Sequence, residues 1–275
     1  MSLAYFFDIM GAFDQVCIQG IIDEMSKRGF PTQFIKWYGH YLKHRKLEAR
    51  ILGVKVSRFL VQGCPQGGVI SPIAWNVVFD VLLQRLNDQK CQSSLKGNGI
   101  VVGFADDGLA LIQGIDPCTI VSIGQKILDK AKEWGDDFSL KFPPEKTLAM
   151  MFTLRKLEKL PVKLELKLNN KNINFTSSIK YLGMTLTPNL SWNQHISNKI
   201  QKTRGRLLQI SSLSRKQWGV KPQIMDWAFR AIGIPMLTYG SIVWGCWKVP
   251  KFILNKLNSL QWLAMVCLAP ICLLS

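Results

Sequence analysis

The chain has 275 residues and carries 35 Lys and Arg against 18 Asp and Glu, a formal net charge of +17. Hydrophobic residues make up 48 % of it, which excludes a disordered chain and allows one large domain or two small ones. The charge surplus favours a polyanionic partner, either nucleic acid or an acidic membrane face. The seven cysteines include no Cys-x-x-Cys pair, which favours reduced thiols in an intracellular protein over a zinc ribbon or a disulfide framework.

Apolar periodicity in the first part of the chain predicts a mixture of strands and helices. The expected elements are a strand at 3–7, helices at 15–28 and 31–44, and a hairpin with strands at 47–53 and 54–61. A further helix is predicted to begin at Ser71-Pro72, because Ser supplies an N-cap oxygen and Pro fits the first helical position. This helix is expected to run to Asn87.

The middle of the chain predicts a tight hairpin, in which the apolar runs 100–104 and 109–114 flank Ala105-Asp106-Asp107-Gly108. The elements expected next are a helix at 118–140, a strand at 148–153, and a hairpin of 162–168 with 172–176 around Asn169-Asn170. From Trp192 onward helical patterns dominate, so we place a domain boundary near residue 190.

Two stretches near the C-terminus, 231–247 and 259–275, contain no charged residue. Each is at the short limit for a helix that spans a bilayer. Pro235 and the glycines of the first stretch favour a bent, packed helix. We therefore expect buried core or a surface that a partner covers, and no membrane. A membrane-associated helical protein is the alternative that liposome flotation would detect.

Positive charge is concentrated in two stretches. Residues 27–58 hold nine Lys and Arg and one acid, and residues 196–230 hold eight Lys and Arg and one acid. A solvated basic face is one explanation. Because the two stretches flank an acidic centre, a groove for a phosphate backbone explains them better.

The acidic centre consists of Asp8, at the end of the first predicted strand, and of Asp106 and Asp107, at the tip of the predicted hairpin. Each of them alone is explained by capping or by ordinary turn chemistry. Together, carboxylates beside apolar strands repel one another unless a cation joins them. Carboxylates from two adjacent strands are typical of sites for two Mg²⁺ ions, roughly 3.5–4 Å apart, that catalyse nucleotidyl transfer.

Five ordered motifs then indicate a family. They are DIMGAFD (8–14), PQGGVISP (65–72), FADD (104–107), PPEKT (143–147) and KYLGMTLTPNLSWNQHI (180–196). Their order resembles that of motifs A to E in the reverse transcriptase of non-LTR (LINE-type) retrotransposons, and the resemblance covers about residues 3–245. It implies an α+β fold: a polymerase palm at 1–190, with a ferredoxin-like antiparallel sheet backed by helices, and a helical thumb-like region at 191–275.

The resemblance also implies roles for individual residues. Asp8, Asp106 and Asp107 match the metal ligands, and Lys146 matches a lysine that protonates the pyrophosphate leaving group. The residues that match substrate-binding positions are Phe13 beneath the incoming sugar, Gln66 and Gly67 near the template–nucleotide pair, and Tyr181, Leu182 and Gly183 at the primer end. The structural alternatives are a packed core residue for Phe13, a surface lysine for Lys146 and an ordinary turn for Gln66 and Gly67.

The function implied is that of an RNA-directed DNA polymerase that uses Mg²⁺, dNTPs, an RNA template and a DNA primer. In this family the fingers and an endonuclease are expected upstream of the first motif, so the chain is predicted to be a truncated piece that can lack activity by itself. The alternative is a remnant that binds nucleic acid through its basic stretches without catalysis. The polymerase requires Asp8 and Asp106 to meet in the fold; if they lie on opposite sides of the molecule, only a basic binding protein remains.

Overall fold

The computed structural model describes residues 1–87, 98–153, 165–211, 222–245 and 251–268. The chain forms two compact units, Met1–Ser177 and Ser178–Ser275. The division therefore falls earlier than residue 190, where the sequence placed it. The segment between the two positions contains a short hairpin that packs against the helix following it, and for this reason it groups with the helical unit.

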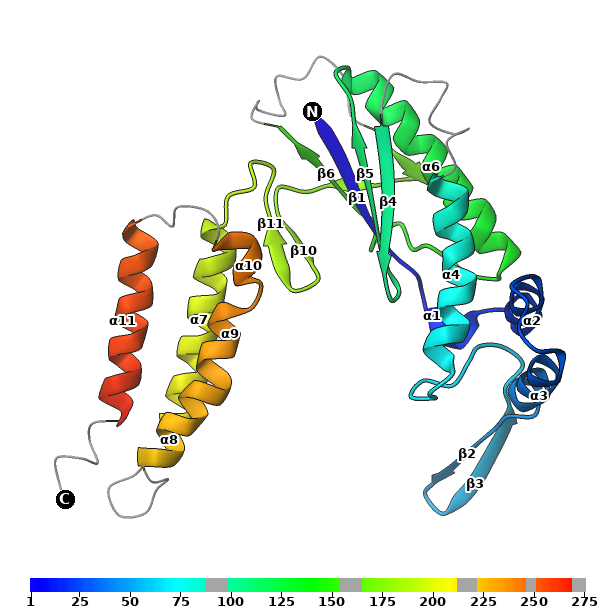
Figure 1. Ribbon diagram of the computed structural model, residues 1–275, viewed down its shortest axis with the longest axis horizontal. Coiled ribbons are helices and arrows are strands. Elements are labelled where there is room, and N and C mark those ends of the chain that lie inside the picture. Colours follow the sequence, from blue (N-terminus) through cyan, green and yellow to red (C-terminus); the bar gives the residue numbers. More distant parts are fainter. Residues whose placement is uncertain (88–97, 154–164, 212–221, 246–250, 269–275) are drawn as a thin grey trace. The chain divides into compact units, whose positions relative to one another are not determined.

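The first unit is built on a β-α-β-β-α-β arrangement (Figure 1). Its elements are β1 (Ser2–Asp8), α4 (Ser71–Asn87), β4 (Asn98–Phe104), β5 (Asp107–Gln113), α6 (Pro117–Asp137) and β6 (Leu148–Phe152). The sheet order is β4-β5-β1-β6, and these neighbours are all antiparallel. The expected ferredoxin-like fold is thus confirmed.

Helices α4 and α6 lie against one face of this sheet (Figure 1). Leu3, Tyr5 and Phe7 of β1 are buried in the main core with residues of both helices, and the Tyr5 hydroxyl donates to the Gly124 carbonyl of α6 at 3.4 Å. Because side chains alternate along a strand, Asp8 projects on the opposite face from Phe7. Helices α4 and α6 therefore cover the face opposite Asp8, and the face that carries Asp8 also holds the buried residues Ala4, Phe6 and Met150.

The segment between β1 and α4 follows the predicted pattern, except that a short helix not predicted from the sequence precedes the helix expected at 15–28. It contains α1 (Ala12–Gln15), α2 (Ile18–Lys27), α3 (Thr32–Lys43) and the hairpin of β2 (Lys46–Ile51) with β3 (Val54–Phe59). Both hairpin strands are exposed along their whole length. Helix α2 packs against α3 and α4, which anchors the segment to the main core.

The hairpin expected at 162–168 and 172–176 needs correction. Its first strand was predicted to begin among residues that lie outside the described part of the chain. What pairs is β7 (Lys167–Leu168) with β8 (Lys171–Asn172), two residues each. The next strand, β9 (Asn174–Phe175), instead extends the main sheet parallel to β6, where Ile173 is buried in the core beside it.

The second unit consists of a hairpin and helices. The elements are β10 (Ile179–Tyr181), β11 (Met184–Leu186), α7 (Asn193–Ser211), α8 (Pro222–Ala228), a π-helical turn (Phe229–Gly233), α9 (Ile234–Thr238), α10 (Ser241–Trp244) and α11 (Lys251–Leu268). Helices α9 and α11 both pack against α7. Within the described residues, no helix combines the length and the apolar character needed to cross a membrane.

Candidate active site

The site begins where β1 ends and β5 starts. In the antiparallel register Asp8 stands directly opposite Asp107, one step beyond the pair of Phe7 and Gly108. Residues directly opposite in such a ladder have Cα atoms about 4.5–5.5 Å apart and side chains on the same face. Two carboxylates from distant parts of the sequence therefore lie side by side on the face of the sheet opposite α4 and α6, and both are half-buried.

Asp106 reaches the same end of the sheet from the turn between β4 and β5. Phe104 pairs with Asp107, so the two-residue turn is Ala105-Asp106, and Asp107 belongs to the strand. The expectation that Asp106 and Asp107 both occupy the tip is corrected in this respect. The backbone of Ala105 is left-handed, with φ 55°, and its carbonyl accepts a 2.8 Å hydrogen bond from Nε1 of Trp75 on α4.

The three carboxylates influence one another electrostatically. Burial raises the pKa of Asp107, and the negative charges of Asp106 and Asp8 raise it further. Such mutual repulsion is the physical signature of acids placed close together without a sufficient counter-charge. This end of the sheet therefore attracts cations.

One cation of the chain already occupies this position. Nζ of Lys146 donates to Oδ2 of Asp8 at 2.9 Å. This hydrogen bond raises the pKa of Lys146, with smaller contributions from the charges of Asp8 and Asp106. The lysine is presented by a compact turn, because the backbone amides of Lys146 and Thr147 both donate to the Pro143 carbonyl at 3.1 Å. Lys146 itself is largely exposed and can leave Asp8 without disturbing the core.

The chemistry of this donor set fits Mg²⁺, because it offers carboxylate oxygens and neither His nor Cys. Among the described residues, however, no three or more His, Cys, Asp or Glu side chains are already grouped around a common point as metal ligands. In this arrangement the Lys146 ammonium is the cation that contacts Asp8. The carboxylate of Asp106 is the third of the group, and its position is set by the Ala105-Asp106 turn.

Phe13 and the loop before α4 lie near the same turn. The Phe13 ring packs against Trp75 with centroids 5.7 Å apart, and the Phe13 carbonyl accepts from the Cys64 amide at 2.7 Å. Gln66 donates from Nε2 to Oδ2 of Asp14 at 3.4 Å. Gly67 has φ +83°, and a Cβ there would meet no atom within 4 Å, so its glycine serves the backbone conformation of an open loop.

The remaining predicted residues, Tyr181, Leu182 and Gly183, belong to the other unit. Tyr181 ends β10 and pairs with Met184, and Leu182 and Gly183 form the two-residue turn to β11, with φ 45° and 76°. The Leu182 carbonyl accepts a 2.8 Å hydrogen bond from the Tyr239 hydroxyl. This turn is therefore fixed by its own unit.

Sequence reasoning missed Trp75 and Tyr239. Trp75 is 1 % exposed and sits one turn into α4, where an apolar residue is expected in any case. Only the hydrogen bond from its indole to Ala105 reveals that it supports the turn carrying Asp106. Tyr239 lay in a stretch that the sequence marked only as free of charge, and no spacing connects it to residue 182.

The sheet with its two covering helices is a polymerase palm, and comparison with known proteins identifies the family. Residues 2–186 match the family described as reverse transcriptase (RNA-dependent DNA polymerase), so the chain belongs to this family. The predicted resemblance to non-LTR retrotransposon enzymes is confirmed by relatives of that class.

One similar protein is the putative 115 kDa protein in the type-1 retrotransposable element R1DM of Drosophila melanogaster, 26 % identical over 242 residues. Another is the probable RNA-directed DNA polymerase from transposon BS of the same fly, 28 % identical over 264 residues. They are matched over 88 % and 95 % of this chain, which spans 22 % and 28 % of their own lengths. Among solved structures, a Candida tropicalis telomerase in complex with a telomeric RNA fragment is similar, at 9 % identity and a TM-score of 0.49 over 86 % of this chain and 39 % of that one.

Proposed function

We propose that this protein is the catalytic palm of an RNA-directed DNA polymerase, which transfers nucleotides from dNTPs to a DNA primer along an RNA template. The observation that carries the proposal is the register that sets Asp8 opposite Asp107, with Asp106 in the adjoining turn. The family supports the reaction class. The net charge of +17 supports a nucleic-acid partner.

In this proposal Asp8, Asp106 and Asp107 hold two Mg²⁺ ions. When bound, such ions activate the attacking hydroxyl and stabilise the leaving pyrophosphate. The raised pKa of Asp107 supports this role, because a site strained by like charges binds a cation favourably. Lys146 then gives up its contact with Asp8 and places its proton on the leaving pyrophosphate.

The substrate positions follow from the resemblance and from local geometry. Phe13, held by Trp75, presents its ring to the sugar of the incoming nucleotide and disfavours a 2′-hydroxyl by overlap. Gln66 and Gly67 lie on an exposed loop that can approach the template–nucleotide pair. The turn of Tyr181, Leu182 and Gly183 contacts the primer end.

Primer extension on an RNA template tests the proposal. The purified chain is expected to add dNTPs only when Mg²⁺ is supplied, and Asp106→Asn is expected to abolish the addition. Asp136→Asn, the same change at an exposed position of α6, is the matched control and keeps the rate of the unaltered chain.

Two outcomes contradict the proposal. One is extension by Asp106→Asn at the rate of the control. The other is a well-folded chain that binds RNA and primer but extends nothing, even when a fingers region from a related enzyme is supplied. That second result supports a nucleic-acid-binding remnant without catalysis.

A further inference from the structure

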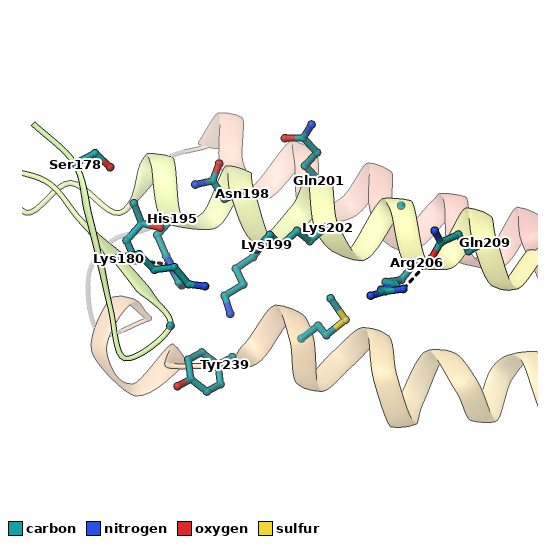
Figure 2. A pocket seen from close by; sticks show the side chains of 14 residues that line it. Ser178, Lys180, His195, Asn198, Lys199, Gln201, Lys202, Arg206, Gln209 and Tyr239 are labelled. Atoms are coloured by element: carbon teal, nitrogen blue, oxygen red, sulfur yellow. Dashed lines mark hydrogen bonds between the residues drawn. The ribbon is translucent and has the colours of Figure 1, made fainter. Parts of the chain in front are cut away.

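The second unit contains a cavity of about 1020 Å³ between the β10–β11 hairpin, α7 and the segment that ends at Tyr239. Figure 2 shows side chains from all three parts directed toward this space. All of the described lining residues belong to the second unit, so the cavity is a feature of that unit alone.

The lining is strongly basic. Lys180 comes from β10, and Lys199, Lys202 and Arg206 come from α7. None of the described residues that line the cavity is Asp or Glu. Four cations thus share one concave surface whose described lining offers no carboxylate, and an anionic ligand would relieve their mutual repulsion.

Lys199 is at the centre of this group. Burial lowers its pKa, and the positive charges of Lys202 and Lys180 lower it further. Its Nζ lies 4.2 Å from the centroid of the Tyr239 ring, a cation–π contact that holds the ammonium inside the cavity. The contact with Tyr239 therefore keeps the Lys199 ammonium in a position where the neighbouring lysines repel it.

Tyr239 joins this cation to the β10–β11 turn. Its hydroxyl donates to the Leu182 carbonyl at 2.8 Å, and a Cβ at Gly183 would come within 2.9 Å of its ring. One side chain therefore contacts Lys199 through its face and the turn through its hydroxyl and edge. Replacing Gly183 would push the turn away from the ring.

A buried histidine completes the lining. His195 is 1 % exposed, and its Nδ1 accepts from the Thr185 amide at 3.1 Å. Its Nε2 is buried without a well-formed hydrogen bond among the described residues. Burial lowers the pKa of His195 and the charge of Lys199 lowers it further, while a backbone contact with Tyr239 raises it, so this histidine links α7 and the hairpin to the segment that ends at Tyr239.

We propose that this cavity binds phosphates of a nucleic-acid strand through Lys199 and Lys202, and that Tyr239 is the positioning residue that holds Lys199 and the Leu182–Gly183 turn around that strand. The inference rests on the proposed function for its ligand. It adds a phosphate contact in the second unit and the residue that organises it.

Binding of a fluorescent primer–template oligonucleotide, measured by anisotropy over a range of salt concentrations, tests the contact. Lys199→Ala and Lys202→Ala are each expected to weaken binding about tenfold. Each is also expected to lower the slope of log affinity against log salt by about one, because one phosphate contact is lost. Lys202 is exposed, so its replacement does not threaten folding.

Lys251→Ala is the matched control, because Lys251 is exposed on α11 and is not among the described residues that line the cavity. It is expected to change neither affinity nor slope by a comparable amount. Equal effects at all three lysines would overturn the proposal, since they would indicate a diffuse basic surface. Displacement of the oligonucleotide by dNTP or inorganic phosphate at the concentration of the strand would also overturn it.

Tyr239 is tested by two substitutions. Tyr239→Phe keeps the ring under Lys199 but removes the hydrogen bond to the Leu182 carbonyl, so it is expected to weaken binding less than Tyr239→Leu does, while hydrogen exchange at the β10–β11 turn accelerates. Tyr239→Leu removes the ring and is expected to weaken binding about two- to fivefold, with no further loss when combined with Lys199→Ala. Additive losses would overturn the positioning role.

This assay needs no catalysis, so its failure is distinguishable from that of the proposed reaction. Asp106→Asn is expected to bind the oligonucleotide like the unaltered chain. If the chain binds the oligonucleotide as expected but extends no primer, the proposed reaction is refuted and the proposed phosphate contact stands. If the chain extends primers but Lys199→Ala and Lys202→Ala bind the oligonucleotide normally, the proposed phosphate contact is refuted and the proposed reaction stands.

Discussion

Gly108 determines how closely β1 and β5 approach beside the acidic residues. It stands opposite Phe7 in the register, and a Cβ at this position would overlap the Phe7 ring. That ring is 3 % exposed and makes an edge contact with Phe142 at 5.6 Å between centroids. Because the ring is enclosed, Gly108→Ala must be accommodated by separation of the two strands.

Overpacking of this kind costs about 1–3 kcal/mol of unfolding free energy. For a unit of this size the loss corresponds to a melting temperature lower by about 2–12 °C. Gly99→Ala in β4 is the matched control, because its new Cβ would come no closer than 3.5 Å to Ile127. The control is expected to melt at the original temperature or slightly above it, since alanine restricts the unfolded chain more than glycine.

Thermal unfolding of both variants, followed by circular dichroism with and without Mg²⁺, measures the difference. Strand separation at Gly108 also moves Asp107 away from Asp8, so the Mg²⁺-induced rise in melting temperature is expected to shrink. Equal melting temperatures for Gly108→Ala and Gly99→Ala would refute the packing argument.

Three further predictions concern charged residues. Folding raises the pKa of Asp107, so ionisation of this carboxyl lowers the stability of the folded chain at pH values above its ordinary pKa of 3.8. Asp107→Asn is therefore expected to raise the melting temperature at neutral pH in the absence of metal. The increase is expected to vanish as the pH falls toward 3.8. Lys146→Gln is expected to change the unfolding free energy by less than about 1 kcal/mol, because its ion pair with Asp8 is exposed. It is expected to slow single-nucleotide addition about 10²–10⁴-fold in rapid-quench assays. Lys132→Gln, the control, is expected to leave that rate unchanged. Asp116→Ala removes the N-cap that accepts from the Thr119 amide at 2.8 Å and is expected to cost about 0.5–2 kcal/mol in denaturant titrations; an unchanged midpoint would contradict the cap.

The sheet and its helices were predictable because their signals are local. Apolar runs ending at Asp8 and flanking residues 105–108 predicted β1, β4 and β5, and Ser71-Pro72 predicted the start of α4. The grouping of the acids at one end of the sheet followed from placing these strands together.

Single-residue register was not predictable from these signals. That Asp107, and not Asp106, stands directly opposite Asp8 depends on which two residues form the turn. The left-handed Ala105 and the indole of Trp75, thirty positions away in sequence, belong to that geometry. Long-range contacts of this kind also explain why the role of Tyr239 and the parallel pairing of β9 with β6 were not predicted, since the periodicity of a sequence does not indicate which distant segments pair.

Metal-directed cleavage tests the central claim most directly. Fe²⁺ in place of Mg²⁺, with ascorbate and peroxide, generates radicals that cut the backbone beside the bound ion. The account predicts two sets of cuts, near residue 8 and near residues 106–107, both suppressed by excess Mg²⁺ and absent from Asp8→Asn. Cuts at only one of these segments, or at neither, would contradict a shared cation between β1 and the β4–β5 turn.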